Sequence, residues 1–167
     1  VLTDDFPRDH YHHHGVFWTW PHVGVDGTDY DLWTDVGGLH QEFVRLLSKE
    51  AGSTATVLGV ENKWVVEDKT VMIERVWITV YSRSEMTRSV DLDFVWIPTD
   101  EPVTLQGAAG KSYGGLTVRF RPPTSKDPST LITVPDGPTT GDLSETPLPW
   151  ADYTSRFTES ESRSGAA

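Results

Sequence analysis

The amino-acid sequence predicts an all-β protein made of antiparallel strands. Four segments are rich in valine, isoleucine, threonine and aromatic residues, and several of them alternate between apolar and polar side chains. Short polar connections, such as residues 66–69 and 82–85, have the composition of hairpin turns. Strands that follow one another at such short intervals pair antiparallel, and sheets of this kind stack into a sandwich. An antiparallel β-sandwich, or the larger supersandwich, is therefore the expected fold.

The strands themselves are expected at residues 54–66, 70–81, 88–97 and 115–120. Side chains alternate between the two faces of a strand, and in the third segment every second residue is apolar with aspartates between them. One face of that strand is therefore expected to be buried, and it carries Val90, Leu92, Phe94 and Trp96. The tryptophans in the middle of strands are expected in the core: Trp64, Trp77 and Trp96.

For two other segments the sequence does not decide the secondary structure. Residues 40–48 place Phe43, Leu46 and Leu47 on one side of a helix of about two turns, although a strand fits nearly as well. Residues 122–149 hold most of the prolines, which predicts a long loop that wraps the sheets. A strand at residues 131–134 fits inside that loop.

The predicted organisation is a single domain followed by a short tail. Residues 1–157 are expected to form one β-sandwich domain, and residues 158–167 a polar tail. The chain begins with valine and ends in Ser-Gly-Ala-Ala, so we expect an incomplete fragment of a larger domain, cut at both ends.

Composition and charge exclude several partners. The chain has 25 acidic and 14 basic residues, for a formal net charge of −11, so it repels nucleic acid and anionic membrane surfaces. There is no cysteine, which excludes disulfides and thiolate chemistry. No apolar run reaches the roughly 18 residues of a membrane span. A soluble protein is expected, with the compartment and the oligomeric state left open; secretion and the periplasm are among the alternatives. Sugars, peptides and metal ions remain as ligands.

A histidine cluster is the first candidate site. Four of the six histidines lie within residues 10–14 (HYHHH), next to an aromatic segment. Clusters of titratable side chains mark functional sites, and a neutral imidazole is a general acid or base near neutral pH. We expect catalytic roles for His10, His12 and His13. No cofactor is predicted, but a divalent metal bound by His10, His12 and His14 stays open as an alternative.

Further candidates are substrate-binding side chains. Trp18 and Trp20 follow the cluster and offer apolar ring faces to a sugar, although core packing explains most tryptophans. Lys111 and Arg119 flank a glycine-rich turn and suit a carboxylate such as that of a uronic acid; structural salt bridges are their alternative role. Glu74 interrupts an apolar strand, where it points either into a cleft or to solvent.

The chain resembles a bacterial family called PmoA-like. Residues 10–18 (HYHHHGVFW) are similar to the family's His-Pro-His-His-Arg-Gly motif, with Tyr11 in place of proline and His14 in place of arginine. Glu74-Arg75 is similar to the family's Glu-Arg strand. Lys111, with Gly115 and Arg119, is similar to its Lys-Glu-Gly…Arg segment, with Ser112 in place of the acidic residue. Trp150-Ala151-Asp152-Tyr153 is similar to its Trp-x-Asp-Tyr motif. The resemblance implies a galactose-mutarotase-like supersandwich of roughly 200–250 residues or more, a fold of sugar epimerases, lyases and glycosidase domains.

Three functional hypotheses follow. The first is a carbohydrate-active domain of the hydrolase, lyase or epimerase type with a histidine-centred site. The second is a non-catalytic carbohydrate-binding module on the same sandwich. The third is a metal-dependent enzyme that uses the histidine cluster.

Overall fold

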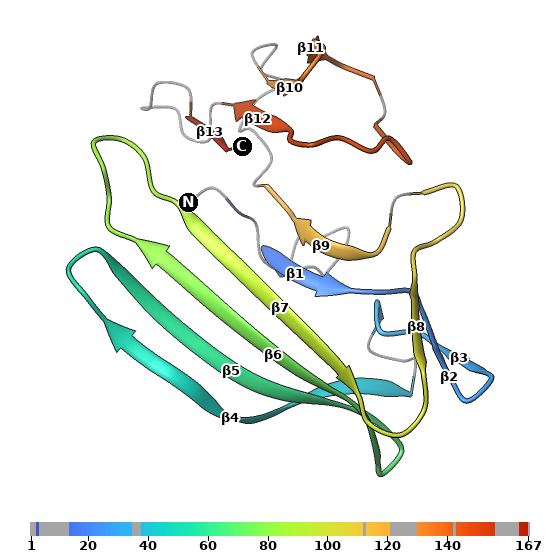
Figure 1. Cartoon of the computed structure of the whole chain (residues 1–167). Coiled ribbons are helices and arrows are strands. Elements are labelled where there is room, and N and C mark those ends of the chain that lie inside the picture. Colours follow the sequence, from blue (N-terminus) through green and yellow to red (C-terminus); the bar gives the residue numbers. More distant parts are fainter. Residues whose placement is uncertain are drawn as a thin grey trace. The chain divides into compact units, whose positions relative to one another are not determined.

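The computed structural model describes Thr3 and residues 14–34, 38–111, 113–120, 130–141, 143–155 and 164–166. The secondary-structure elements within these residues are all β-strands, which confirms the all-β prediction (Figure 1). The chain divides into two compact units. We call residues 20–106 the central unit, and residues 1–19 together with 107–167 the terminal unit. The single domain predicted for residues 1–157 stays a prediction.

The larger sheet of the central unit has four antiparallel strands in the order β4-β5-β6-β7 (Figure 1). They are β4 (Leu39–Ala51), β5 (Ala55–Val66), β6 (Lys69–Tyr81) and β7 (Val90–Pro98). Three of these strands coincide with predicted segments. The connections between β5, β6 and β7 are the predicted short turns, and each strand pairs with its neighbour in sequence.

A second sheet of the central unit has three strands in the order β3-β2-β8. They are β2 (His22–Val25), β3 (Thr28–Tyr30) and β8 (Val103–Gln106). Its valines pack against one face of the larger sheet, which makes the central unit a two-layer arrangement with an apolar core. The buried members of that core are Val23, Val25, Leu39, Trp64, Val71 and Met72.

Residues 40–48 belong to strand β4, so the helix considered for them is wrong and the strand is confirmed. The register shifts twice, between Phe43 and Arg45 and between Leu46 and Ser48. Each shift is a bulge that adds one residue to β4 opposite β5. Because Val44 is the extra residue, Phe43 and Leu46 share a face although they are three positions apart. The bulge therefore gives the apolar side chains of a strand the three-residue spacing that is typical of a helix.

Strand β7 follows the predicted alternation except at its first residue. Leu92, Phe94 and Trp96 are half-buried, and the residues between them are exposed. The Phe94 and Trp96 rings stack with centroids 5.2 Å apart. Val90 is exposed and was wrongly expected to be buried, because it begins an edge strand with a neighbour on one side only.

Trp77 also departs from its expected place. Its cross-strand partners are Gly59 on β5 and Asp93 on β7. Side chains alternate along β6, so Trp77 lies on the face opposite to Glu74, and it is partly exposed. The expected core position is therefore wrong for Trp77, whereas Trp64 is fully buried and Trp96 packs against the core.

The terminal unit contains two further sheets. Strand β1 (Val16–Thr19) pairs with β9 (Gly115–Val118), and β11-β10-β12-β13 forms a four-stranded sheet. These last strands are β10 (Leu131–Val134), β11 (Gly137–Thr139), β12 (Asp152–Ser155) and β13 (Ser164–Ala166). Strands β9 and β10 confirm the strands expected at residues 115–120 and 131–134. Strand β13 lies within the segment predicted as a tail.

Candidate functional site

Of the predicted histidine site, the structure describes only the last residue, His14. His10, His12 and His13 lie outside the described residues, so their catalytic and metal-binding roles stay predictions. His14 is exposed and lies two residues before β1. Among the described residues, no group of three or more histidine, aspartate or glutamate side chains is placed to hold a metal ion.

The terminal unit brings two predicted segments together that are a hundred residues apart in sequence. The backbone N–H of Arg119 donates to the carbonyl oxygen of Gly15 at 2.7 Å. Trp18 lies on β1 opposite Leu116 of β9, and is half-buried. Lys111 is exposed, with its ammonium 5.7 Å from the Tyr113 ring centroid. The end of the histidine segment therefore adjoins the strand that leads into Arg119.

Trp20 belongs to the central unit and packs against its core. Its ring centroid lies 5.8 Å from that of Trp64 and 5.3 Å from that of Trp96, the second pair in an edge-to-face arrangement. Edge-to-face packing of this kind stabilises aromatic clusters. The structure thus places Trp20 against Trp64 and Trp96, the two tryptophans whose indole N–H groups donate to Glu74.

Glu74 is the most unusual polar side chain of the central unit, because its exposed fraction is 0%. Its Oε2 accepts hydrogen bonds from the indole N–H groups of Trp96 at 3.0 Å and Trp64 at 3.3 Å. Gln41 Nε2 reaches the same oxygen at 3.3 Å, and Asn62 Nδ2 donates to Oε1 at 2.9 Å. We call these five residues the Glu74 centre. A buried carboxylate needs such donors, since desolvation without them is very costly.

Gln41 connects the Glu74 centre to a cavity. The cavity measures about 350 Å³ and is lined by Leu32, Thr34, Leu39, His40 and Gln41. Asp31 shapes its rim, because its carboxylate accepts from the backbone N–H of Trp33 at 2.6 Å and from the Thr34 hydroxyl at 2.6 Å. Gln41 therefore both lines this cavity and donates to the buried Glu74.

A groove of about 410 Å³ lies on the outer face of the three-stranded sheet. We call it the β2 groove. Within it, His22 Nδ1 lies 2.7 Å from Asp29 Oδ2, with side chains 47% and 60% exposed. Its floor is Gly24, where a Cβ atom would lie only 2.3 Å from Thr104 Oγ1. The lining residues are His22, Gly24, Asp26, Gly27, Thr28, Asp29, Pro102, Thr104 and Gln106.

The local sequence explains the His22–Asp29 pair. Asp26 and Gly27 both have positive φ angles, 48° and 75°, as the two central residues of a type I′ hairpin turn require. This turn sets Gly24 opposite Asp29, so His22 lies diagonally across from that carboxylate on the same face. An ionised carboxylate only accepts, so Nδ1 donates and the other ring nitrogen, Nε2, is left to take up or give a proton.

Sequence reasoning missed His22 and Asp29, although a signal for them was present. The Asp26-Gly27 dipeptide between two short apolar stretches is a strong hairpin indicator, and it fixes which residues are cross-strand neighbours. The prediction instead relied on the clustering of the four histidines within residues 10–14.

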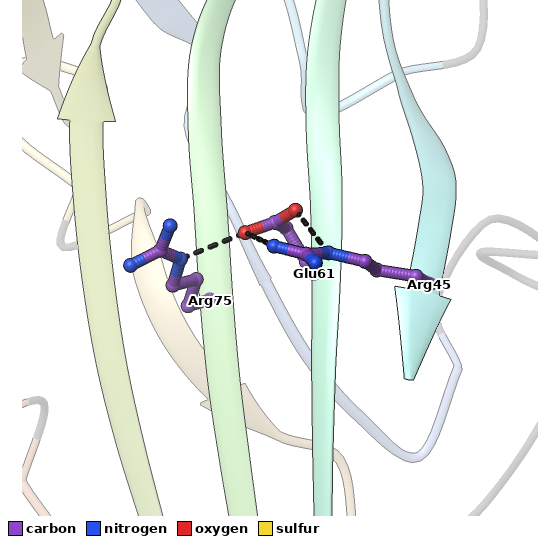
Figure 2. Close-up of polar contacts among 3 residues, drawn as sticks. All are labelled: Arg45, Glu61 and Arg75. Atoms are coloured by element: carbon purple, nitrogen blue, oxygen red, sulfur yellow. Dashed lines mark hydrogen bonds and ion pairs between the residues drawn. The ribbon is translucent and has the colours of Figure 1, made fainter. Parts of the chain in front are cut away.

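A charged cluster lies on the open face of the larger sheet. Figure 2 shows Glu61 of β5 between Arg45 of β4 and Arg75 of β6. Glu61 Oε1 lies 2.8 Å from Arg45 Nε, and its Oε2 lies 2.8 Å from Arg75 Nε. Hydrogen bonds from Arg45 and then Arg75 lower the pKa of the Glu61 carboxyl, and Glu61 raises the pKa of Arg45. We call these three residues the arginine pair cluster.

The lowered pKa predicts an acid-sensitive contribution to stability. A carboxyl whose pKa is lower in the folded chain stabilises the fold above its usual pKa of 4.5, and this contribution disappears as the pH falls through the lowered value. We expect the melting temperature of the wild type to exceed that of Glu61→Gln at neutral pH, and the two to converge in acid. Thermal unfolding across that range measures it. Glu50→Gln, an exposed change on β4, should show no such convergence.

Fold and site together define an all-β domain with a polar surface groove and a buried carboxylate centre. The chain belongs to the family of unknown function DUF6807, whose model matches residues 1–167. No curated protein and no solved structure matches it. Within the residues that the structure describes, no helix has the length and apolar character needed to cross a membrane.

Proposed function

We propose that this chain is a carbohydrate-active domain of the hydrolase, lyase or epimerase type, in which an imidazole moves a proton at a bound sugar. The observation that supports this best is the His22–Asp29 pair inside the polar β2 groove. A histidine oriented by a carboxylate is a common proton-transfer device, because the carboxylate fixes the tautomer and stabilises the imidazolium.

The lining of the β2 groove suits a polyhydroxylated ligand. Asp26, Thr104 and Gln106 offer carboxylate, hydroxyl and amide groups, each of which pairs with sugar hydroxyls. Few polar groups converge elsewhere on this sheet, since its other face carries core valines. The net charge of −11 disfavours phosphate-bearing ligands in the same groove.

The resemblance to PmoA-like proteins supports the same class of ligand. It implies a galactose-mutarotase-like supersandwich, and in that interpretation His10, His12 and His13 belong to the site with Lys111 and Arg119. The contact between Gly15 and Arg119 favours this grouping, because it joins the two segments in one sheet. Fold alone does not determine chemistry, so the ligand must be tested directly.

The first test is a glycan screen that compares the wild type with groove variants. We expect Thr104→Ala and Gln106→Ala to weaken binding of the selected glycan by about ten- to hundredfold, since each removes a side-chain group that pairs with the ligand. Isothermal titration measures the affinity. Glu101→Gln, which removes an exposed acidic side chain outside the lining of the β2 groove, is the matched control and should bind as the wild type does.

The outcomes separate the two carbohydrate hypotheses. Binding with turnover supports the enzyme, and binding without turnover supports the non-catalytic module. Unchanged affinity in both groove variants would reject the β2 groove as the sugar site.

A further inference from the structure

The open face of the four-stranded sheet carries a second arrangement suited to a sugar. Cross-strand partners place Glu61 beside Arg75, and the next pair on the same face is Gly59 beside Trp77. Positions two residues apart along a strand are separated by roughly 7 Å, about the width of a sugar ring. An indole ring and a guanidinium group therefore lie next to each other on a surface.

The arginine pair cluster has an unbalanced positive charge. Two guanidinium groups share one carboxylate, and the exposed fractions are 61% for Arg45, 40% for Arg75 and 9% for Glu61. The cations thus face solvent while the anion lies beneath them. Arg75 uses Nε for Glu61, and neither of its Nη atoms has a hydrogen-bond partner among the described residues. The two terminal nitrogens form one of the edges through which a guanidinium binds a carboxylate by two parallel hydrogen bonds.

Trp77 supplies an independent observation. A Cβ atom at Gly59 would lie 2.9 Å from both Cδ1 and Nε1 of the indole, so the ring covers the glycine closely. The indole N–H of Trp77 has no acceptor among the described residues, whereas those of Trp64 and Trp96 both bind Glu74. Tryptophan N–H groups usually find a partner when buried, and a partly exposed one is available to a ligand.

Asp93 completes the arrangement on the other side of Trp77. It is the cross-strand partner of Trp77 on β7 and is exposed. Sugar-binding surfaces combine an aromatic ring face with polar planar groups at its edge, because the ring takes the C–H face of a pyranose while the edges take its hydroxyls. Arg75 and Asp93 provide one donor edge and one acceptor edge.

We infer that this surface, formed by Arg45, Glu61, Arg75, Trp77 and Asp93, binds an oligosaccharide that contains uronic acid. The pyranose ring stacks on Trp77, and its carboxylate pairs with Arg75 and Arg45. Glu61 holds the two guanidinium groups in position. The inference rests on the proposed function for the class of ligand, and it names the acidic sugar and a second binding surface.

The test compares trigalacturonate with its fully methyl-esterified form, which has the same sugar and no charge. The wild type is expected to bind the acid more tightly, and added salt should reduce that difference. Arg75→Gln should weaken binding of the acid by about ten- to hundredfold and weaken binding of the ester much less. Trp77→Ala should weaken both by about tenfold.

Controls keep the result interpretable. Lys63→Gln removes a cation from the same face, where Lys63 pairs with Glu42, and should bind as the wild type does. Arg75→Lys keeps the charge without the planar fork, so it should recover only part of the affinity. Melting temperatures establish that every variant is folded.

Each outcome bears on one proposal. Loss of acid binding in Arg75→Gln but not in His22→Ala supports this surface, and the reverse pattern overturns it while leaving the β2 groove intact. Equal binding of acid and ester by the wild type also overturns it. If a folded wild type binds neither form but binds another glycan through the β2 groove, the acidic ligand is rejected and the proposed function stands.

Discussion

Replacing Glu74 with alanine is expected to lower the free energy of unfolding by about 3–5 kcal/mol. The carboxylate is fully buried and accepts four hydrogen bonds from described residues. Its removal leaves the fully buried indole N–H of Trp64 and the partly buried donors of Asn62 and Trp96 without their acceptor, and each buried group left unpaired costs about 1–3 kcal/mol. Since small domains are stable by about 5–15 kcal/mol in total, this variant is expected to be close to its unfolding limit. Urea-induced unfolding, followed by tryptophan fluorescence, measures the loss.

Two comparisons isolate the cause. Glu74→Gln keeps one acceptor oxygen for Gln41, Trp64 and Trp96, and Asn62 can rotate its amide to meet the new N–H group. Its cost should therefore be smaller, about 1–3 kcal/mol. Glu50→Ala, an exposed change on β4, should stay within about 0.5 kcal/mol of the wild type. A small loss in Glu74→Ala, comparable to that control, would contradict the role of Glu74 as the acceptor that holds three strands together.

A strand is most easily predicted where one of its faces is more apolar than the other. Strand β7 shows this directly, with half-buried Leu92, Phe94 and Trp96 and exposed residues between them. Strand β6 is different, since apolar residues occupy both of its faces. The β-branched and aromatic composition then identifies the strand, but no alternation identifies the inner face. The face of Trp77 was therefore not available from the sequence.

Bulges limited the prediction for β4. Two register shifts within thirteen residues break the simple alternation that sequence reasoning relies on. The apolar side chains Phe43 and Leu46 then appear at a helical spacing, although they lie on one face of a strand. Propensity and period cannot separate these cases, because the extra residue is specified by pairing with β5.

The sequence indicated Glu74 itself but not the donors of the Glu74 centre. A lone acidic residue in an apolar strand singled out Glu74, but its donors come from β4, β5 and β7, at sequence separations of 33, 12, 10 and 22 residues. Their convergence depends on the register of all four strands, which the sequence leaves open. The His22–Asp29 pair is the opposite case, since a two-residue turn fixes its geometry locally.

Under the proposed function, replacing His22 with alanine is expected to reduce turnover of the sugar substrate by about 10²–10⁴ while leaving the melting temperature nearly unchanged. The His22–Asp29 pair is 47% and 60% exposed, and exposed ion pairs contribute about 0–1 kcal/mol to stability. Loss of the proton carrier, in contrast, acts on the transition state alone.

The comparison with the histidine cluster identifies which imidazole carries the proton. His12→Ala and His13→Ala, measured with the same substrate, provide the reference. A large loss of turnover in His22→Ala with its melting temperature preserved assigns proton transfer to the β2 groove. Full activity in His22→Ala, together with a loss in His12→Ala or His13→Ala, assigns it to residues 10–14 instead. Asp29→Asn should fall between His22→Ala and the wild type, because it leaves the imidazole in place but removes the carboxylate that fixes its tautomer.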